Sequence, residues 1–309
     1  MHIDCIQDFI DKIRGKKNGG IPKYGIKHIY EDKDSAKIIS DEILANKPSL
    51  ICRFGAVEMS TLDCFLKSKN ETTIKFPEKI KYPMAYNAGF FPANDYMLSR
   101  FSSELIDITR NIDVIGVWFL QGENYVLENY APNAKLVRLR DICPLLSSGI
   151  SWTRLLRGKR VLVIHPFEES IKAQYKRRKL LFANEDYLPE FELITMKPVQ
   201  SFHDCVNDLN YNNWFEALDD MKEQIKNINF DIALIGAGAY GIFLAEYCKA
   251  LGKKAVHMGG ALQLLFGIIG KRWEEDKAFK EKYINEYWIR PSKNERPKGC
   301  EKVENGCYW

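Results

Sequence analysis

The sequence lacks long hydrophobic runs, paired cysteines and a large net charge. Its longest apolar stretch, residues 255–270, contains four glycines, a histidine and a glutamine, and it is shorter than the roughly 20 residues of a membrane-spanning helix. The eight cysteines include no CxxC pair, which excludes common zinc-ligand spacings and favours reduced, buried thiols. Basic residues outnumber acidic ones by only 45 to 41, which argues against a nucleic-acid-binding protein.

Low-complexity tracts and an apolar secretory leader are also missing. The 309 residues are 46% hydrophobic and 28% charged, a composition typical of globular proteins rather than disordered chains. In place of a leader, Ile3, Ile6, Ile10 and Ile13 have the spacing of an amphipathic helix over residues 1–15. The length predicts one large or two modest domains, and the reduced thiols predict a cytoplasmic protein.

Short β-rich runs alternate with helical patterns from about residue 49 to residue 270, which is typical of parallel strands joined by crossover helices. We therefore predict an α/β fold of Rossmann-like type, with a mainly parallel sheet flanked by helices. The predicted strands are residues 49–54, 113–119, 135–139, 160–165, 191–196, 230–235 and 254–258. The clearest predicted helix is residues 214–228, which has one apolar stripe and one charged face.

The domain prediction has three parts. A helical extension covers residues 1–40, a Rossmann-like domain covers residues 41–289 with two halves that meet near residue 158, and a surface tail covers residues 290–309. Two loop-rich stretches, residues 68–95 and 200–213, are longer than packing requires. Such loops carry ligand contacts, act as lids, or are solvated connectors.

A strand that leads into a GxGxxG turn is the most conspicuous motif. Gly236, Gly238 and Gly241 follow the predicted strand 230–235 and open a helix, which is the arrangement that lets backbone N–H groups approach a phosphate. An NAD site also needs an acidic residue about 20 positions further on, but the next strand ends in His257-Met-Gly-Gly. The motif therefore predicts another phosphate-bearing ligand, or else tight packing of a helix on a strand.

A second glycine-rich turn follows the next predicted strand. Gly259 and Gly260 precede a helix expected over residues 261–269 that contains Gln263, and the pair Lys271 and Arg272 follows it. Adjacent turns of this kind can form an anion-binding crevice. The two basic residues either neutralise phosphate or complement a helix dipole, and the glutamine either binds ligand or is a buried amide with internal partners.

Charged or titratable residues end two further strands. His165 ends the strand 160–165 and could act as a base or bind a phosphate oxygen, although the Pro and acids that follow it also suit a helix start. Arg53 and Glu58 follow the strand 49–54. Because charges at a buried strand end are costly unless matched or used, this pair is either catalytic or a structural salt bridge.

Several of these motifs resemble a known family. The stretch Arg53-Phe-Gly-Ala-Val-Glu resembles the arginine-phenylalanine-glycine-aspartate-glycine-glutamate sequence near the start of GT-D fold glycosyltransferases. Residues 87–91, 165–167, 236–241 and 259–267 are similar to segments of that superfamily, which occurs in bacterial surface-polysaccharide loci. The resemblance covers roughly residues 40–275.

The resemblance implies an enzyme that moves a sugar from a nucleotide-diphosphate sugar, typically a UDP-sugar, to a glycan, protein or lipid-linked acceptor. The family associates an aspartate-x-glutamate pair with a divalent metal, Mn²⁺ or Mg²⁺, at the donor diphosphate. Ala56 stands at the aspartate position, so Glu58 alone is the implied metal ligand, or else the base toward the acceptor. Arg53 could orient it or, with the basic pair after residue 270, neutralise the leaving diphosphate without a metal.

The resulting site prediction has two sets of residues. The predicted catalytic residues are Glu58, Arg53 and His165, the last as a reserve base. The predicted donor-binding residues are Gly55, Gly236, Gly238, Gly241, His257, Gly259, Gly260, Gln263, Lys271 and Arg272.

Two alternatives stay open at the level of sequence. The first is a non-catalytic nucleotide-binding or scaffold protein of a polysaccharide assembly complex, which would need a sizeable exposed apolar patch for its partner. The second is a dehydrogenase, which the missing acidic residue disfavours, so no NAD is expected. The sequence leaves homo-oligomerisation and peripheral association with the inner face of a membrane undecided.

Overall fold

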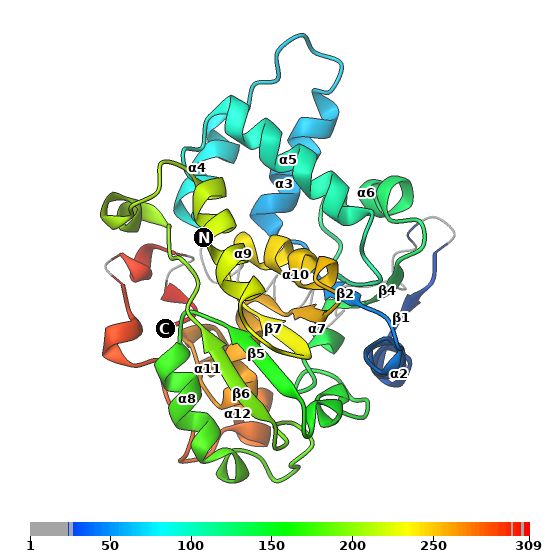
Figure 1. The fold of residues 1–309 in the computed structure, drawn as a ribbon, viewed down its shortest axis with the longest axis vertical. Coiled ribbons are helices and arrows are strands. Elements are labelled where there is room, and N and C mark those ends of the chain that lie inside the picture. Colours follow the sequence, from blue (N-terminus) through cyan, green and yellow to red (C-terminus); the bar gives the residue numbers. More distant parts are fainter. Residues whose placement is uncertain (1–23, 25–26, 298, 304–305) are drawn as a thin grey trace.

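A computed structural model of the chain describes residue 24 and residues 27–297, 299–303 and 306–309. They form one sheet of eight strands, all paired in parallel, in the order β1-β4-β3-β2-β8-β7-β5-β6 (Figure 1). The strands are β1 (Ile29–Tyr30), β2 (Ser49–Cys52), β3 (Val114–Val117), β4 (Lys135–Arg138), β5 (Arg160–Ile164), β6 (Glu192–Met196), β7 (Ile232–Ile235) and β8 (Lys254–His257). The predicted α/β class with a parallel sheet is confirmed.

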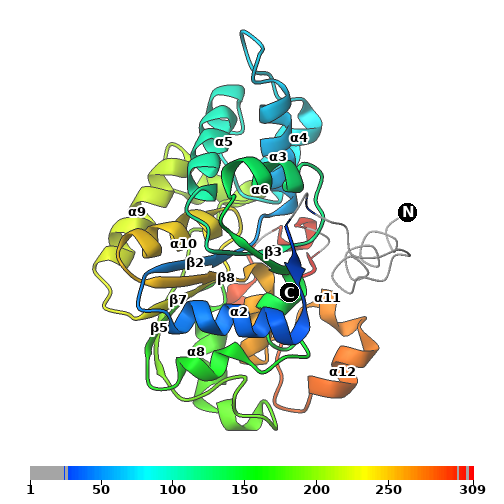
Figure 2. The same cartoon turned by 90° about the vertical axis from the view of Figure 1, so that its right-hand side faces the viewer.

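Helices cover both faces of the sheet (Figure 2). One face carries α3 (Ala56–Lys67), α5 (Asp95–Thr109), α9 (Trp214–Lys226) and α10 (Tyr240–Ala250). The other carries α2 (Asp32–Leu44), α7 (Leu139–Ile142), α8 (Glu168–Lys176), α11 (Lys271–Glu274) and α12 (Lys277–Tyr283). The remaining helices are α4 (Glu78–Tyr86), beside α3, and α6 (Glu123–Tyr130). Among the described helices, none is long and apolar enough to cross a membrane.

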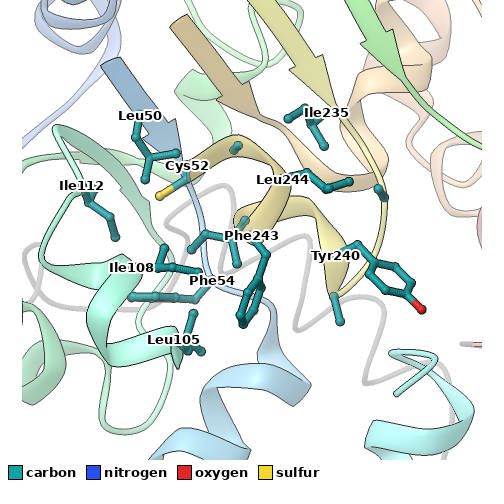
Figure 3. Packing of buried hydrophobic residues seen from close by; sticks show 14 of the residues in the cluster. Leu50, Cys52, Phe54, Leu105, Ile108, Ile112, Ile235, Tyr240, Phe243 and Leu244 are labelled. Carbon is teal, nitrogen blue, oxygen red and sulfur yellow. The ribbon is translucent and has the colours of Figure 1, made fainter. Parts of the chain in front are cut away.

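The central strands β2, β3 and β7 are fully buried, because helices cover both faces of the sheet there. Leu50 and Cys52 of β2 lie in the hydrophobic cluster shared with α5 and α10, whereas Ile51 lies in the cluster on the opposite face, as the two-residue period of a strand requires. Figure 3 shows Phe54 and Phe243 in the first cluster, between β2, α5 and α10.

The sheet has a topological switch point between β2 and β8. These strands are neighbours, but the chain leaves β2 into α3 on one face and leaves β8 into a 3-10 helix (Gly259–Phe266) on the other face. In open parallel sheets, ligands bind outside the carboxyl ends of the strands at such a point. A ligand site is therefore expected at the carboxyl edge of the sheet, near Arg53 and Gly259.

Several sequence predictions need correction. The segment 290–309, expected to be a surface tail, buries Glu295, Val303, Cys307 and Trp309 against the domain, because its apolar side chains pack at the carboxyl edge. The helix expected over residues 261–269 is the shorter 3-10 helix, which ends at a left-handed Gly267. The loop-rich stretch 68–95 contains α4, and the two-residue β1 was not predicted.

Other sequence predictions agree with the structure. The helix expected over residues 214–228 is α9, and the seven predicted strands correspond to β2 through β8. The seven cysteines of the described residues are free thiols, and four of them are buried. The amphipathic helix expected over residues 1–15 lies outside the described residues.

Candidate functional site

Arg53 brings a positive charge to the switch point, because it directly follows β2. It is half-buried, and its guanidinium lies 4.9 Å from the centre of the Trp118 ring, which is the geometry of a cation–π contact. Trp118 is itself fixed, since its indole N–H donates to the Phe54 carbonyl at 3.1 Å. A Cβ atom at Gly259 would lie 3.7 Å from Arg53, so the guanidinium is held beside the turn after β8.

A buried carboxylate that the sequence analysis missed holds the loop after β3. Glu123 is fully buried, and its Oε2 accepts hydrogen bonds from Tyr24 Oη at 2.6 Å, Leu120 N at 3.2 Å and Trp118 N at 3.3 Å. Between these donors Phe119 has a φ of 64°, a strained value for a bulky residue. Burial raises the pKa of Glu123. In the sequence, this residue resembles an ordinary acid in a first helical turn.

The three glycines of the GxGxxG turn have different roles. A Cβ at Gly236 would lie 2.7 Å from the Gly259 carbonyl oxygen, so its absence lets the turns after β7 and β8 approach each other. Gly238 has a φ of 53° and open space beside it, with one carbonyl oxygen 3.9 Å away. At Gly241 a Cβ would overlap the His257 ring. The structure therefore gives Gly241 and His257 a packing role, while Gly238 borders open space.

The start of α10 offers unpaired backbone donors. The N–H groups of Tyr240 and Gly241 bond back to the carbonyls of Ala237 and Gly238, which makes the turn tight. Within the described part of the chain, no group accepts from the N–H groups of Ala237, Gly238 or Ala239. The dipole of α10 adds partial positive charge at this end, so the turn suits an anion.

Both predicted histidines are buried and neutral. Burial lowers the pKa of His165 and of His257 to about 3, and the nearby charge of Arg53 contributes at His257. The Phe167 N–H donates to Nδ1 of His165 at 3.0 Å, so the proton of this neutral ring is on Nε2. A group with so low a pKa is a weak general base at neutral pH, although a position beside Gly236 leaves His165 near the site.

Glu58 lies close to Gly55, at the start of α3. Its carboxylate fills the space that a Cβ of Gly55 would occupy. Ala56, at the position of the family aspartate, is exposed. The Glu58 carboxylate therefore lies over the start of α3, and its catalytic role stays a prediction.

The protein ligands do not fit a resident divalent metal. In the described residues, no group of three or more His, Cys, Asp or Glu side chains could hold a metal ion. Mg²⁺ needs an octahedral set of oxygens and Mn²⁺ prefers similar ligands, and Glu58 is the one residue that the motif supplies. The positive charge available at this edge comes from Arg53 and from backbone N–H groups.

The remaining predicted donor residues lie against the segment 306–309. The Tyr308 ring occupies the space where a Cβ of Gly260 would be, and Arg272 lies 4.9 Å from the centre of that ring. Buried Gln263 donates to the Tyr308 carbonyl at 3.2 Å, and the exposed Lys271 contributes its backbone N–H to the same segment. These residues form a second group that holds the segment in place.

The segment 306–309 also closes the edge above β5. Trp309 packs on Phe167 and Phe202 with ring centres about 6 Å apart, and its indole N–H donates to the Glu295 carbonyl at 3.0 Å. The Glu295 carboxylate accepts from the N–H and hydroxyl groups of Ser170 at the start of α8. A protein carboxylate thus occupies this helix N-terminus, which leaves the start of α10 for an external anion.

Comparisons with known proteins give one structural match. No family model matches the chain, and no curated protein matches it. Among solved structures, the chain is similar to one described as "The highly conserved domain of unknown function 1792 has a distinct glycosyltransferase fold", with a TM-score of 0.47, 11% identity, and coverage of 87% of this chain and 86% of that chain. The likeness is one of fold, so function has to be inferred from this chain's own side chains.

Proposed function

We propose that the chain is a glycosyltransferase that uses a nucleotide-diphosphate sugar, most simply a UDP-sugar, as its donor. This proposal rests on a row of positively charged and N–H donor groups along the carboxyl edge of the sheet. Arg53 lies against Gly259, and Gly259 lies against Gly236, where the turn with the unpaired N–H groups begins. A diphosphate can span such a line because both ends supply donors or positive charge.

The chemistry needed at this edge is stabilisation of a leaving diphosphate. As the bond between the anomeric carbon and the phosphate oxygen breaks, negative charge grows on that oxygen. The Arg53 guanidinium lies 4.9 Å from the Trp118 ring centre before the sugar donor binds. Hydrogen-bond donors and charges that are already in place lower the activation barrier of sugar transfer, because they need no reorganisation during the reaction. This stabilisation comes from the chain's own cation and N–H groups, with any metal held chiefly by the substrate.

The acceptor hydroxyl has to lose a proton during transfer. Glu58 takes this proton in the proposed mechanism, after its carboxylate turns away from Gly55. His165 is the weaker candidate because burial lowers its pKa to about 3. The acceptor is a glycan, a glycoprotein or a lipid-linked saccharide, and the site lies where such a molecule could reach it from solvent, since Gly238 is exposed.

The first test is UDP binding by isothermal titration calorimetry, with Mn²⁺ and with a chelator. We expect Arg53→Ala to weaken UDP binding by roughly 10- to 100-fold, since a charge-assisted hydrogen bond contributes about 1.5–3 kcal/mol. Arg110→Ala is the matched control, because Arg110 is exposed and pairs with Asp107 on the surface. Equal UDP affinity in the Arg53 and Arg110 variants would remove Arg53 from the donor site.

A second test places a side chain at the open position of the glycine turn. Asparagine tolerates positive φ better than most residues, so Gly238→Asn should fold and obstruct the diphosphate. Gly158→Asn is the matched control, because Gly158 has a φ of 72° and nothing within 4 Å of its Cβ position. We expect UDP binding to be lost in the first variant alone. Unchanged binding in both would return Gly238 to a purely structural role.

The non-catalytic alternative is favoured by one observation. In this conformation the Glu58 carboxylate lies over Gly55, and His165 is a weak base because burial lowers its pKa to about 3. A UDP-binding protein that releases no UDP from any UDP-sugar, with or without acceptor, would support this alternative. Donor turnover that is lost in Glu58→Gln, while UDP binding is kept, would support the transferase.

A further inference from the structure

Two stacked tyrosines on α4 are the feature that the donor site leaves unexplained. The rings of Tyr82 and Tyr86 have centres 4.2 Å apart and planes inclined by 25°. Tyr82 is 58% exposed and Tyr86 is half-buried. Residues four apart lie on the same side of a helix, so the pair forms one aromatic strip along α4.

The inner end of this strip lies next to the proposed donor turn. Tyr86 is two residues before Ala88, so their Cα atoms are at most about 7.6 Å apart. The Ala88 carbonyl oxygen is in turn 3.9 Å from the Cβ position of Gly238. Four residues of helix separate Tyr86 from Tyr82, a rise of about 6 Å. Tyr86 is therefore the nearer of the two tyrosines to the donor turn along the chain, and the strip has a length comparable to one or two sugar rings.

The strip is also fixed relative to that turn. The Ser201 hydroxyl bonds to the Gly89 carbonyl at 2.5 Å and to the Tyr240 hydroxyl at 2.8 Å. Tyr240 is the first residue of α10 and stacks on Trp214 with ring centres 4.5 Å apart. The chain that leaves α4 is thus tied to the start of α10, and binding groups on such rigid supports keep their geometry.

The chemistry of the strip fits a saccharide. A sugar ring has an apolar C–H face that stacks on an aromatic ring and polar edges that bond to hydroxyl groups, and tyrosine offers both surfaces. The proposed reaction also needs an acceptor beside the donor turn. Lys81, next to Tyr82 in the sequence, is already paired with Asp95 at 2.8 Å, so the strip does not require an anionic ligand.

We propose that Tyr82 and Tyr86 are the acceptor platform, on which sugar rings of a glycan acceptor stack with the reacting hydroxyl toward Gly238. This inference rests on the proposed function, because that function supplies the need for an acceptor. It adds the substrate class, a saccharide bound through its ring faces, and the two residues that recognise it.

The experiment measures saccharide binding without donor and UDP binding without saccharide. Wild-type protein is applied to a microarray of bacterial surface oligosaccharides, and the affinity for the best-bound oligosaccharide is then measured in solution for each variant. We expect Tyr82→Ala and Tyr86→Ala each to weaken this affinity by about tenfold, the loss of one aromatic stacking contact. Tyr82→Phe and Tyr86→Phe should keep most of it, because the ring faces remain.

Tyr125→Ala is the matched control, since Tyr125 is 52% exposed on α6. It should bind saccharide as the wild type does, and every variant should bind UDP equally. Absence of saccharide binding by the wild type, or equal binding by the alanine variants, would overturn the platform. So would a loss of UDP affinity in Tyr86→Ala, which would assign the ring to the donor base, or Tyr-dependent binding to vesicles of anionic phospholipid instead of saccharide. Saccharide binding at the platform without any UDP binding would support the platform and refute the proposed transferase.

Discussion

Acidification should destabilise this protein through two buried histidines. In the folded chain burial lowers the pKa of His165 and His257 to about 3, whereas an unfolded-state histidine has a pKa of about 6.5. Between these values the unfolded state binds more protons than the folded state. Stability must therefore fall as the pH decreases through 6.5 toward 3, and it is fully present above pH 7.

The size of the effect follows from the same values. At pH 5 an unfolded-state histidine is almost fully protonated, while each buried ring stays neutral. Relative to pH 7.5, the loss is about 2 kcal/mol per histidine and about 4 kcal/mol for the pair. Because both folded-state values lie well below 5, the loss at pH 5 depends almost entirely on the unfolded-state pKa.

Other buried groups act in the opposite direction, so the assay has to compare variants. Burial raises the pKa of Glu123 and Asp141, and a carboxyl group of this kind favours the folded state as the pH falls. Urea unfolding at pH 7.5 and pH 5 should be measured for the wild type and for His165→Asn and His257→Asn. Asparagine keeps a polar group near the position of Nδ1, and the exposed His28→Asn is the matched control.

In His165→Asn and in His257→Asn, the decrease in unfolding free energy from pH 7.5 to pH 5 should be about 2 kcal/mol smaller than in the wild type, because one titrating group is removed. Because His28 is exposed, the His28→Asn variant shows how much the substitution itself changes the pH dependence of the unfolding free energy. If His165→Asn and His257→Asn keep the full wild-type pH dependence, the two rings are not held neutral. An NMR titration in which either buried ring protonates above pH 5 in the folded protein would refute the reasoning as well.

The parallel sheet could be predicted from the sequence because both its faces are buried. Continuous apolar runs such as residues 161–164 and 232–235 identify strands without any need for alternation. The two-residue β1 carries no such signal, since Ile29–Tyr30 is too short for a period. The packing of Trp309 was missed because a Lys-, Glu- and Pro-rich segment has a surface composition, and its few apolar residues have no periodic spacing.

The site could be predicted only in part. Motif spacing directed attention to Gly236, Gly238 and Arg53, since glycine turns and charges at strand ends are local signals, and their part in ligand binding stays a prediction. Motif spacing could not distinguish Gly241 from these residues. Gly241 has to lack a Cβ because the His257 ring occupies that space, and His257 belongs to the next strand. Whether a residue of a local motif touches ligand or protein depends on contacts across the sheet.

The aromatic groups around the site had no local signal at all. Trp118, directly after β3, contacts Arg53, and Tyr308 near the end of the sequence covers Gly260. Both contacts join residues far apart in the chain. A single sequence contains no information on such pairs, whereas the sheet order brings them to one edge.

Three further predictions concern stability, each measured as the free energy of unfolding in urea at pH 7.5. Gly241→Ala should cost about 1–3 kcal/mol, because the new methyl group overlaps the His257 ring; an unchanged value would contradict that contact. Trp309→Ala should cost about 3–5 kcal/mol, because its ring is 9% exposed; a loss below about 1 kcal/mol would fit the solvated segment that the sequence suggested. Glu123→Ala should cost at least about 3 kcal/mol, because its carboxylate accepts from three buried or half-buried donors and each unsatisfied donor costs about 1–3 kcal/mol. The matched control is Glu128→Ala on the exposed side of the same helix, with an expected change within about 0.5 kcal/mol. Similar losses in the two glutamate variants would mean that helix propensity, rather than the three hydrogen bonds, explains the contribution of Glu123 and that the strained loop after β3 is held by other contacts.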